Sequence, residues 1–128
     1  MIYIWLNILP IAAATACGLA IGYLWVKASK LRVSAAFAVA AAVAEFWLAA
    51  ILAGAVILAP PQADPWIMAM GSAFIIWIGF VLPVLVVTLG ARGLGAVTVT
   101  SASGYWLVTM MVQAAIMKTM GLVPPPVG

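Results

Sequence analysis

The stretch from Val33 to Ala59, VSAAFAVAAAVAEFWLAAILAGAVILA, decides the fold class. Glu45 is its only charged residue, and the stretch stops at Pro60 and Pro61, which cannot continue a helix. A helix needs about 20 mostly apolar residues to cross the hydrocarbon core of a bilayer. A segment this long and this apolar predicts a transmembrane helix.

The rest of the chain has the same character. Of 128 residues, 69% are hydrophobic and 5% charged, and the mean hydropathy is +1.34. A soluble domain usually has about 25% charged residues, so this chain could not cover its surface in water. We expect an all-α, integral membrane four-helix bundle that forms a single transmembrane domain, 1–128. The expected spans are 2–26, 33–59, 66–91 and 96–122.

The basic residues predict the orientation of these spans. Four of them fall in the first and third turns, which share one side of the membrane: Lys27, Lys30, Arg32 and Arg92. The positive-inside rule places these turns in the cytoplasm and both termini on the periplasmic side of a bacterial inner (plasma) membrane. Lys118, near the outer end of the fourth span, is expected to reach the lipid headgroups.

Composition also excludes several function classes. The chain has no His and one cysteine, Cys17, so protein-ligated zinc, haem and iron–sulfur sites are not expected, and no cofactor or metal is predicted. Five basic residues are too few for a nucleic-acid footprint. No nucleophile–base pair or carboxylate dyad is visible, so we do not expect an enzyme.

Small residues mark the faces where helices meet. Gly18-Leu-Ala-Ile-Gly22 is a GxxxG pair that permits close backbone approach. It can form a dimer seam or a contact inside one bundle, and we favour the second. In the second span one face is small: Ala38, Ala41, Ala42, Glu45, Ala49 and Ala53. The opposite face is bulky: Val39, Val43, Trp47 and Ile51. We expect the small face to meet protein and the bulky face to meet lipid.

Glu45 is therefore expected to point inward near the middle of its span. An acidic residue there costs about 2.5–3.5 kcal/mol on insertion scales, and burial favours its neutral form. One interpretation is a proton- or cation-responsive site; the other is a neutral carboxylic acid that holds helices together by hydrogen bonds. Gly79 falls at a similar depth, and its carbonyl is left free because Pro83 has no N–H to donate. We expect a kink at Pro83 and a contact between Glu45 and this carbonyl.

The fourth span carries a polar stripe that consists of Thr98, Ser101, Tyr105, Thr109 and Gln113. This stripe can line a wet path or hold neighbouring helices by hydrogen bonds. Asn7, Ser72 and Gln113 fall at similar depth and are expected to form one polar cluster.

The order of these features resembles the small bacterial membrane proteins catalogued as domain of unknown function 1761. The resemblance covers most of the chain and rests on Asn7, Gly22-Tyr-Leu-Trp25, Gly79-Phe80, Arg92, Gly104-Tyr-Trp-Leu107 and Met120-Gly121. Such proteins tend to have a Ser-Pro…Phe-Gly-Lys segment where this chain has only Val26–Arg32. The resemblance implies a four-helix inner-membrane protein without an established activity. Ala41-Ala-Val-Ala-Glu45 also resembles the membrane carboxylate of small multidrug-resistance transporters, an analogy of class only.

These features favour a non-catalytic accessory, assembly or structural subunit that packs against itself as a homo-oligomer or against a larger membrane complex. The alternative is a small oligomeric transporter or channel that uses Glu45 and the polar stripe. In either case the lipid bilayer is the surrounding solvent.

Overall fold

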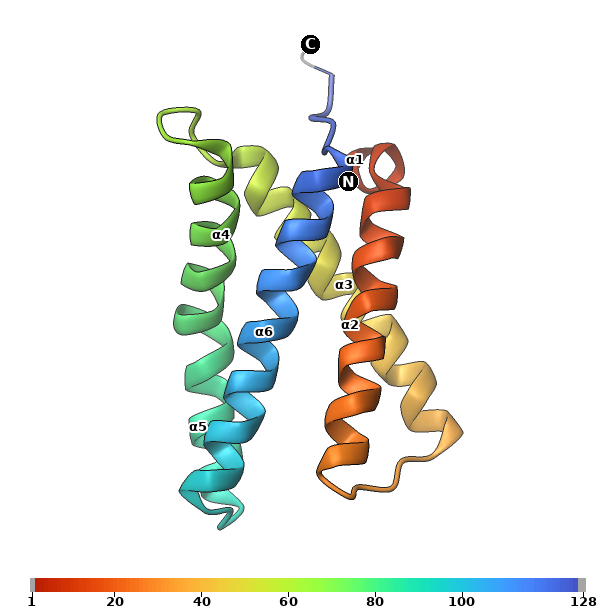
Figure 1. The fold of residues 1–128 in the computed structure, drawn as a ribbon, viewed down its shortest axis with the longest axis vertical. Helices are drawn as coiled ribbons and strands as arrows, with labels where there is room; N and C mark the ends of the chain where they lie inside the picture. Colours follow the sequence, from red (N-terminus) through yellow and green to blue (C-terminus); the bar gives the residue numbers. More distant parts are fainter. Residues whose placement is uncertain (1, 127–128) are drawn as a thin grey trace.

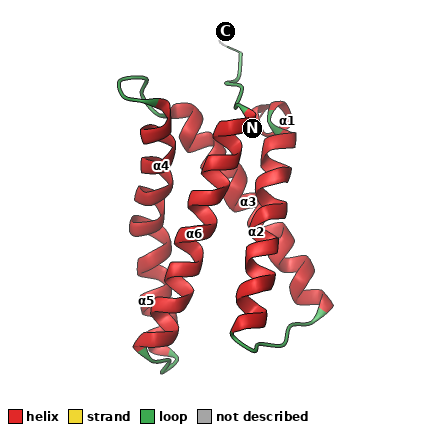
Figure 2. Ribbon diagram, viewed as in Figure 1, coloured by secondary structure: helices red, strands yellow, loops and turns green. Residues whose placement is uncertain are grey.

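The computed structural model describes residues 2–126, and every regular element in that range is a helix (Figure 1, Figure 2). The elements are α1 (Ile2–Leu6), α2 (Ile8–Ala28), α3 (Ala35–Leu58), α4 (Pro65–Ile76), the π-helical turn η1 (Trp77–Val81), α5 (Leu82–Ala91) and α6 (Ala96–Met120). The chain is all-α, as its composition predicts.

Helix α6 is the central helix and contacts α2, α3, α4, η1 and α5. It lies between α2 and the continuous rod of α4, η1 and α5, which we call the 65–91 rod (Figure 1). The buried apolar core gathers at the end of the molecule where both termini lie, with contributions such as Ile11, Leu52 and Met110. Toward the opposite end α2 and α3 diverge, and residues 31–40 are all exposed.

The first predicted helix is interrupted at its outer end. Asn7 has backbone angles of φ −118° and ψ 26°, outside the helical range, and separates α1 from α2. Pro10 explains the break, because its ring crowds the carbonyl of Leu6 and supplies no N–H to it. Helical hydrogen bonds resume where the Ile11 N–H donates to the Asn7 carbonyl (3.0 Å). The predicted span 2–26 therefore consists of two helical segments, α1 and α2.

The 65–91 rod is not one uniform α-helix either. The wider turn η1 precedes Pro83, and within it the Leu82 N–H donates to the carbonyl of Trp77, five residues back. Pro83 cannot donate to Gly79, so the hydrogen-bond register shifts there. The disturbance expected from Pro83 therefore takes the form of a π-helical turn.

The faces predicted for α3 are confirmed from Glu45 onward, whereas Ala38, predicted to face protein, is exposed. Glu45, Ala49 and Ala53 are buried, whereas Val39 is 66% exposed and Val43 is 67% exposed. Small side chains thus meet the other helices, and bulky apolar side chains point outward, as expected when lipid rather than water surrounds a helix.

In the part of the chain that the structure describes, three helical segments are long and apolar enough to cross a membrane: Ile8–Ala28, Ala35–Leu58 and Pro65–Ala91. Helix α6 is as long as these segments but contains more Ser, Thr and Gln, and it is not among the three. The exposed surfaces of the three segments are rich in large apolar side chains, which is consistent with a membrane protein.

Candidate functional site

Glu45 lies at the point where α2, α3 and α6 meet. Its side chain is 3% exposed. The hydroxyl of Tyr105 donates to Glu45 Oε1 (3.1 Å), and the amide Nε2 of Gln113 donates to Glu45 Oε2 (3.2 Å). Both donors belong to α6, so the carboxyl group of α3 is held by two side chains of the neighbouring helix.

Gln113 extends this connection to α2. Its Nε2 also donates to the carbonyl oxygen of Ala14 (3.2 Å), and its side chain is completely buried. A primary amide has two hydrogens on nitrogen, so one goes to α2 and the other to α3. Gln113 Oε1 is buried without a hydrogen-bond partner. One amide thereby joins three helices.

The two glycines of the GxxxG pair leave room for this cluster. A Cβ atom on Gly18 would overlap with Glu45 Oε2 and would lie 2.6 Å from Gln113 Nε2. A Cβ atom on Gly22 would lie 2.7 Å from the hydroxyl of Tyr105. Both glycines therefore face α3 or α6 of the same chain, which is the packing interpretation favoured from the sequence.

Tyr105 is held on several sides. Its ring stacks on the indole of Trp25 in α2, with centroids 4.8 Å apart and planes 10° from parallel. The indole Nε1 of Trp25 donates to Ser101 Oγ (3.1 Å), one turn earlier in α6. Thr109, fully buried, donates to the Tyr105 carbonyl (2.8 Å) and so satisfies its own hydroxyl within α6. These contacts fix the position of the phenol beside Glu45.

A cavity of about 660 Å³ reaches this cluster, and we call it the Glu45 cavity. It lies between the second half of α2, the first half of α3 and Tyr105–Trp106 of α6, where α2 and α3 diverge (Figure 1). Aromatic and small apolar side chains form most of its wall. Among the described residues that line it, Glu45 is the only charged one.

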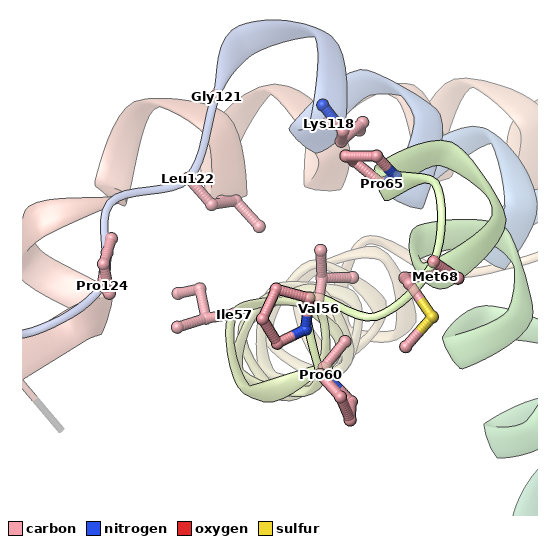
Figure 3. A pocket seen from close by; sticks show the side chains of 12 residues that line it. Val56, Ile57, Pro60, Pro65, Met68, Lys118, Gly121, Leu122 and Pro124 are labelled. Carbon is pink, nitrogen blue, oxygen red and sulfur yellow. The ribbon is translucent and has the colours of Figure 1, made fainter.

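A second cavity, of about 490 Å³, lies at the end where both termini lie (Figure 3). Val56 and Ile57 of α3, Met68 of α4 and Leu122 of the C-terminal tail line it. Lys118 is its only charged lining residue among those described, and the Lys118 ammonium lies 5.6 Å from the ring centroid of Trp66. This cavity is separate from the Glu45 cluster.

Asn7, Ser72 and Gln113 do not form the polar cluster predicted from their depth. Asn7 instead binds the backbone of Val123 in the tail: its Nδ2 donates to the carbonyl (2.8 Å), and its Oδ1 accepts from the N–H (2.6 Å). Ser72 donates to the Met68 carbonyl (2.7 Å). Similar depth did not bring them together, because each side chain finds a backbone partner nearer to it.

The expected contact between Glu45 and the Gly79 carbonyl is not formed. Tyr105 and Gln113 occupy both oxygens of Glu45. A Cβ atom on Gly79 would meet no atom within 4 Å, and Pro83 is exposed. Depth along a helix does not fix the direction in which a residue points, and here this part of the rod faces away from α3.

Two members of the site were not predicted from the sequence. Trp25 forms one wall beside Tyr105, and the Ala14 carbonyl fixes Gln113. Trp25 follows Gly18 and Gly22 at helical spacing, so its position on their face was visible in the sequence. A backbone acceptor such as Ala14 has no sequence signal.

No group of three or more His, Cys, Asp or Glu residues that could hold a metal ion occurs in residues 2–126. Among the described residues that bond to Glu45 or line its cavity, none is basic. The site therefore contains one carboxyl group, one phenol and one amide, a set suited to hydrogen bonding.

No protein-family model, no curated protein and no solved structure matches this chain. The resemblance to the small four-helix membrane family therefore rests on the sequence motifs alone.

Proposed function

We propose that this protein is a small multi-pass inner-membrane protein with four spans and no catalytic site, and that it acts as an accessory, assembly or structural subunit. The observation that carries the proposal is how the interior polar groups are used. Glu45, Tyr105 and Gln113 bond to one another and to α2, and thereby join three helices. A carboxyl group held in this way serves as a connection between helices.

Helix α6 is the proposed fourth span. Its 25 residues reach about 37 Å at 1.5 Å per residue, enough for the hydrocarbon core. Its polar residues Thr109 and Gln113 are completely buried against the other helices. A central helix can be less apolar than its neighbours because they shield it from lipid.

The 65–91 rod is the surface we propose for assembly. Its outer side is apolar; Phe80, for example, is 70% exposed. Gly79 and Gly90 are exposed and lie roughly three turns apart, so they share a face. A Cβ atom on either would meet no atom within 4 Å. Such positions let the backbone of another membrane helix approach closely.

Assembly is tested by purification in mild detergent with chemical crosslinking. We expect a homo-oligomer or a stable complex with another membrane protein, and we expect Gly79→Leu to weaken it without lowering the melting temperature of the chain. Val84→Leu, a change at a position already occupied by a bulky side chain, is the matched control. A monomer without a partner under these conditions would remove the basis of the proposal.

The proposed topology places both termini outside and the turns containing Lys27 and Arg92 in the cytoplasm. In a Cys17→Ser background, a cysteine at position 64 should react with an impermeant maleimide added to intact cells, and a cysteine at position 93 should not. Reaction at position 64 only after permeabilisation would reverse the topology.

The second candidate function is a small oligomeric transporter or channel. The Glu45 cavity favours it, because a wide space leads to a carboxyl group and none of the described lining residues is basic. The test is flux in liposomes: Glu45→Gln should keep the fold and abolish any flux that depends on pH. Flux that is equal in both proteins would exclude a role for this carboxyl.

A further inference from the structure

The accessory role leaves the Glu45 cavity unexplained. Connecting helices requires close packing, whereas here about 660 Å³ stays open beside the most polar point of the interior. Small-molecule sites in proteins are typically about 300–1,000 Å³, mostly apolar, with a few polar groups that fix the ligand. The cavity has this size and this composition.

The amide of Gln113 determines which groups donate and which accept at the polar end of the Glu45 cavity, the end that Glu45 and Tyr105 line. The Ala14 carbonyl can only accept, so the atom of Gln113 that faces it must be the nitrogen. The second hydrogen of the same nitrogen then points to Glu45 Oε2. Oε2 is therefore the accepting, carbonyl-like oxygen of Glu45, and the proton of a neutral Glu45 belongs on Oε1.

A proton on Glu45 Oε1 changes what Tyr105 can do. Oε1 lies 3.1 Å from the hydroxyl of Tyr105, and only one hydrogen fits between the two oxygens. When Oε1 carries that hydrogen, Tyr105 accepts it, and the hydrogen of the phenol is released from Glu45. Tyr105 lines the cavity, and its hydroxyl stands over Gly22, where no Cβ blocks it. Tyr105 then becomes a hydrogen-bond donor at the polar end of the cavity.

The apolar side chains that line the Glu45 cavity indicate what shape of ligand it can bind. Trp25, Phe37 and Trp106 provide aromatic surfaces, and Ala38, Ala41 and Ala44 provide a smooth one. Flat apolar rings fit such walls, since aromatic pairs favour offset-stacked or edge-to-face contacts. None of the described residues that line the cavity is basic, which disfavours an anion, and both oxygens of Glu45 are already bonded, which disfavours a cation.

The cavity opens where α2 and α3 diverge, among residues such as Tyr23 and Phe37 that are 65% and 53% exposed. With the spans placed in a bilayer as proposed above, this opening lies on the lipid-facing surface of α2 and α3, and uncharged ring compounds concentrate in lipid. We infer that the Glu45 cavity binds a membrane-soluble molecule with a flat apolar body and a carbonyl oxygen, the chemistry of a quinone. In the complex Glu45 carries a proton on Oε1 and donates it to Tyr105, which reverses the Tyr105-to-Glu45 hydrogen bond of the ligand-free chain, and the Tyr105 hydroxyl donates to the ligand carbonyl. This inference goes beyond the accessory role and does not depend on it.

The test is a titration of the full chain in nanodiscs with decyl-ubiquinone, followed by the quenching of tryptophan fluorescence. We expect saturable binding that Tyr105→Phe weakens about tenfold, as the loss of one hydrogen bond in an apolar site predicts. Tyr23→Phe removes the other hydroxyl of the cavity wall and is the matched control, with unchanged binding. Ala41→Leu fills the cavity and should abolish saturation.

Glu45→Gln separates this inference from transport. An amide at position 45 can accept from Gln113 through its oxygen and donate to Tyr105 through its nitrogen, which reproduces the neutral acid. We therefore expect Glu45→Gln to keep binding. Decyl-benzene, which has the tail and ring without carbonyls, should bind more weakly and without sensitivity to Tyr105→Phe. Equal binding of both compounds, or equal binding by Tyr105→Phe and the parent protein, would overturn the inference.

Discussion

The two sides of α6 are built differently. On one side, α2 and α3 meet α6 through glycines, alanines and the hydrogen bonds of Glu45 and Gln113. On the other side, the only buried residues of the 65–91 rod are Ala69 and Ala73 of α4.

One side chain of the rod is tied to α6 by a hydrogen bond: the indole of Trp77 donates to the Ser103 carbonyl (2.9 Å). The difference teaches that α2, α3 and α6 are joined by hydrogen bonds between buried side chains, whereas the rod meets α6 mainly through small side chains and leaves a long apolar face exposed.

The largest expected effect comes from replacing a glycine on each side of α6 with leucine and comparing the two variants. Gly18→Leu would force a side chain into the space of Glu45 and Gln113, and overpacking of this kind costs about 1–3 kcal/mol or more. We expect a clearly lower melting temperature in detergent. Gly79→Leu, in open space, should leave the melting temperature unchanged. An equal fall in melting temperature for both variants would contradict the difference in packing between the two sides of α6.

The next effect concerns Glu45 itself. Glu45→Leu removes two interhelical hydrogen bonds, each worth about 1 kcal/mol in membranes. We expect a loss of about 1–2 kcal/mol by steric trapping or thermal unfolding in detergent. Glu45→Gln keeps a donor and an acceptor and should cost much less. A Gln variant as unstable as the Leu variant would mean that the charge, not the hydrogen bonding, stabilises the chain.

The smallest effect belongs to the rod. Trp77→Phe keeps an aromatic ring and removes the hydrogen bond to the Ser103 carbonyl, at a cost of about 0.6 kcal/mol. Hydrogen exchange should rise in residues 77–81 and stay unchanged around Glu45. Faster exchange at Gly18 would show that the rod supports the other side of α6 after all.

Much of the α2–α3–α6 side could be predicted because its sequence signals are local. Alternation of small and bulky residues along α3 determined that Glu45 points inward, and GxxxG spacing indicated where a helix approaches α2. The polar stripe of α6 contained both true partners of Glu45, Tyr105 and Gln113. What the sequence could not supply was the rotation of one helix relative to another.

The contacts that were predicted wrongly are those that depend on how the helices are rotated relative to one another. Gly79 was paired with Glu45 by depth alone, and the wide turn η1 and the direction of the rod were not predictable from that depth. Asn7 binds Val123, a contact that depends on the change of chain direction at Gly121, whose φ of 88° favours glycine. Such a pairing between the two ends of the chain has no periodic pattern to reveal it.

The central claim is that Glu45 and Gln113 act together to join α3 to α6 and α2. A double-mutant cycle with Glu45→Leu and Gln113→Leu, measured as the free energy of unfolding in detergent, tests it directly. We predict a coupling energy of about 0.5–1.5 kcal/mol between these two positions. The same cycle between Glu45→Leu and Trp77→Phe, which share no hydrogen-bond partner, should be additive. Additive losses at Glu45 and Gln113 would contradict the account.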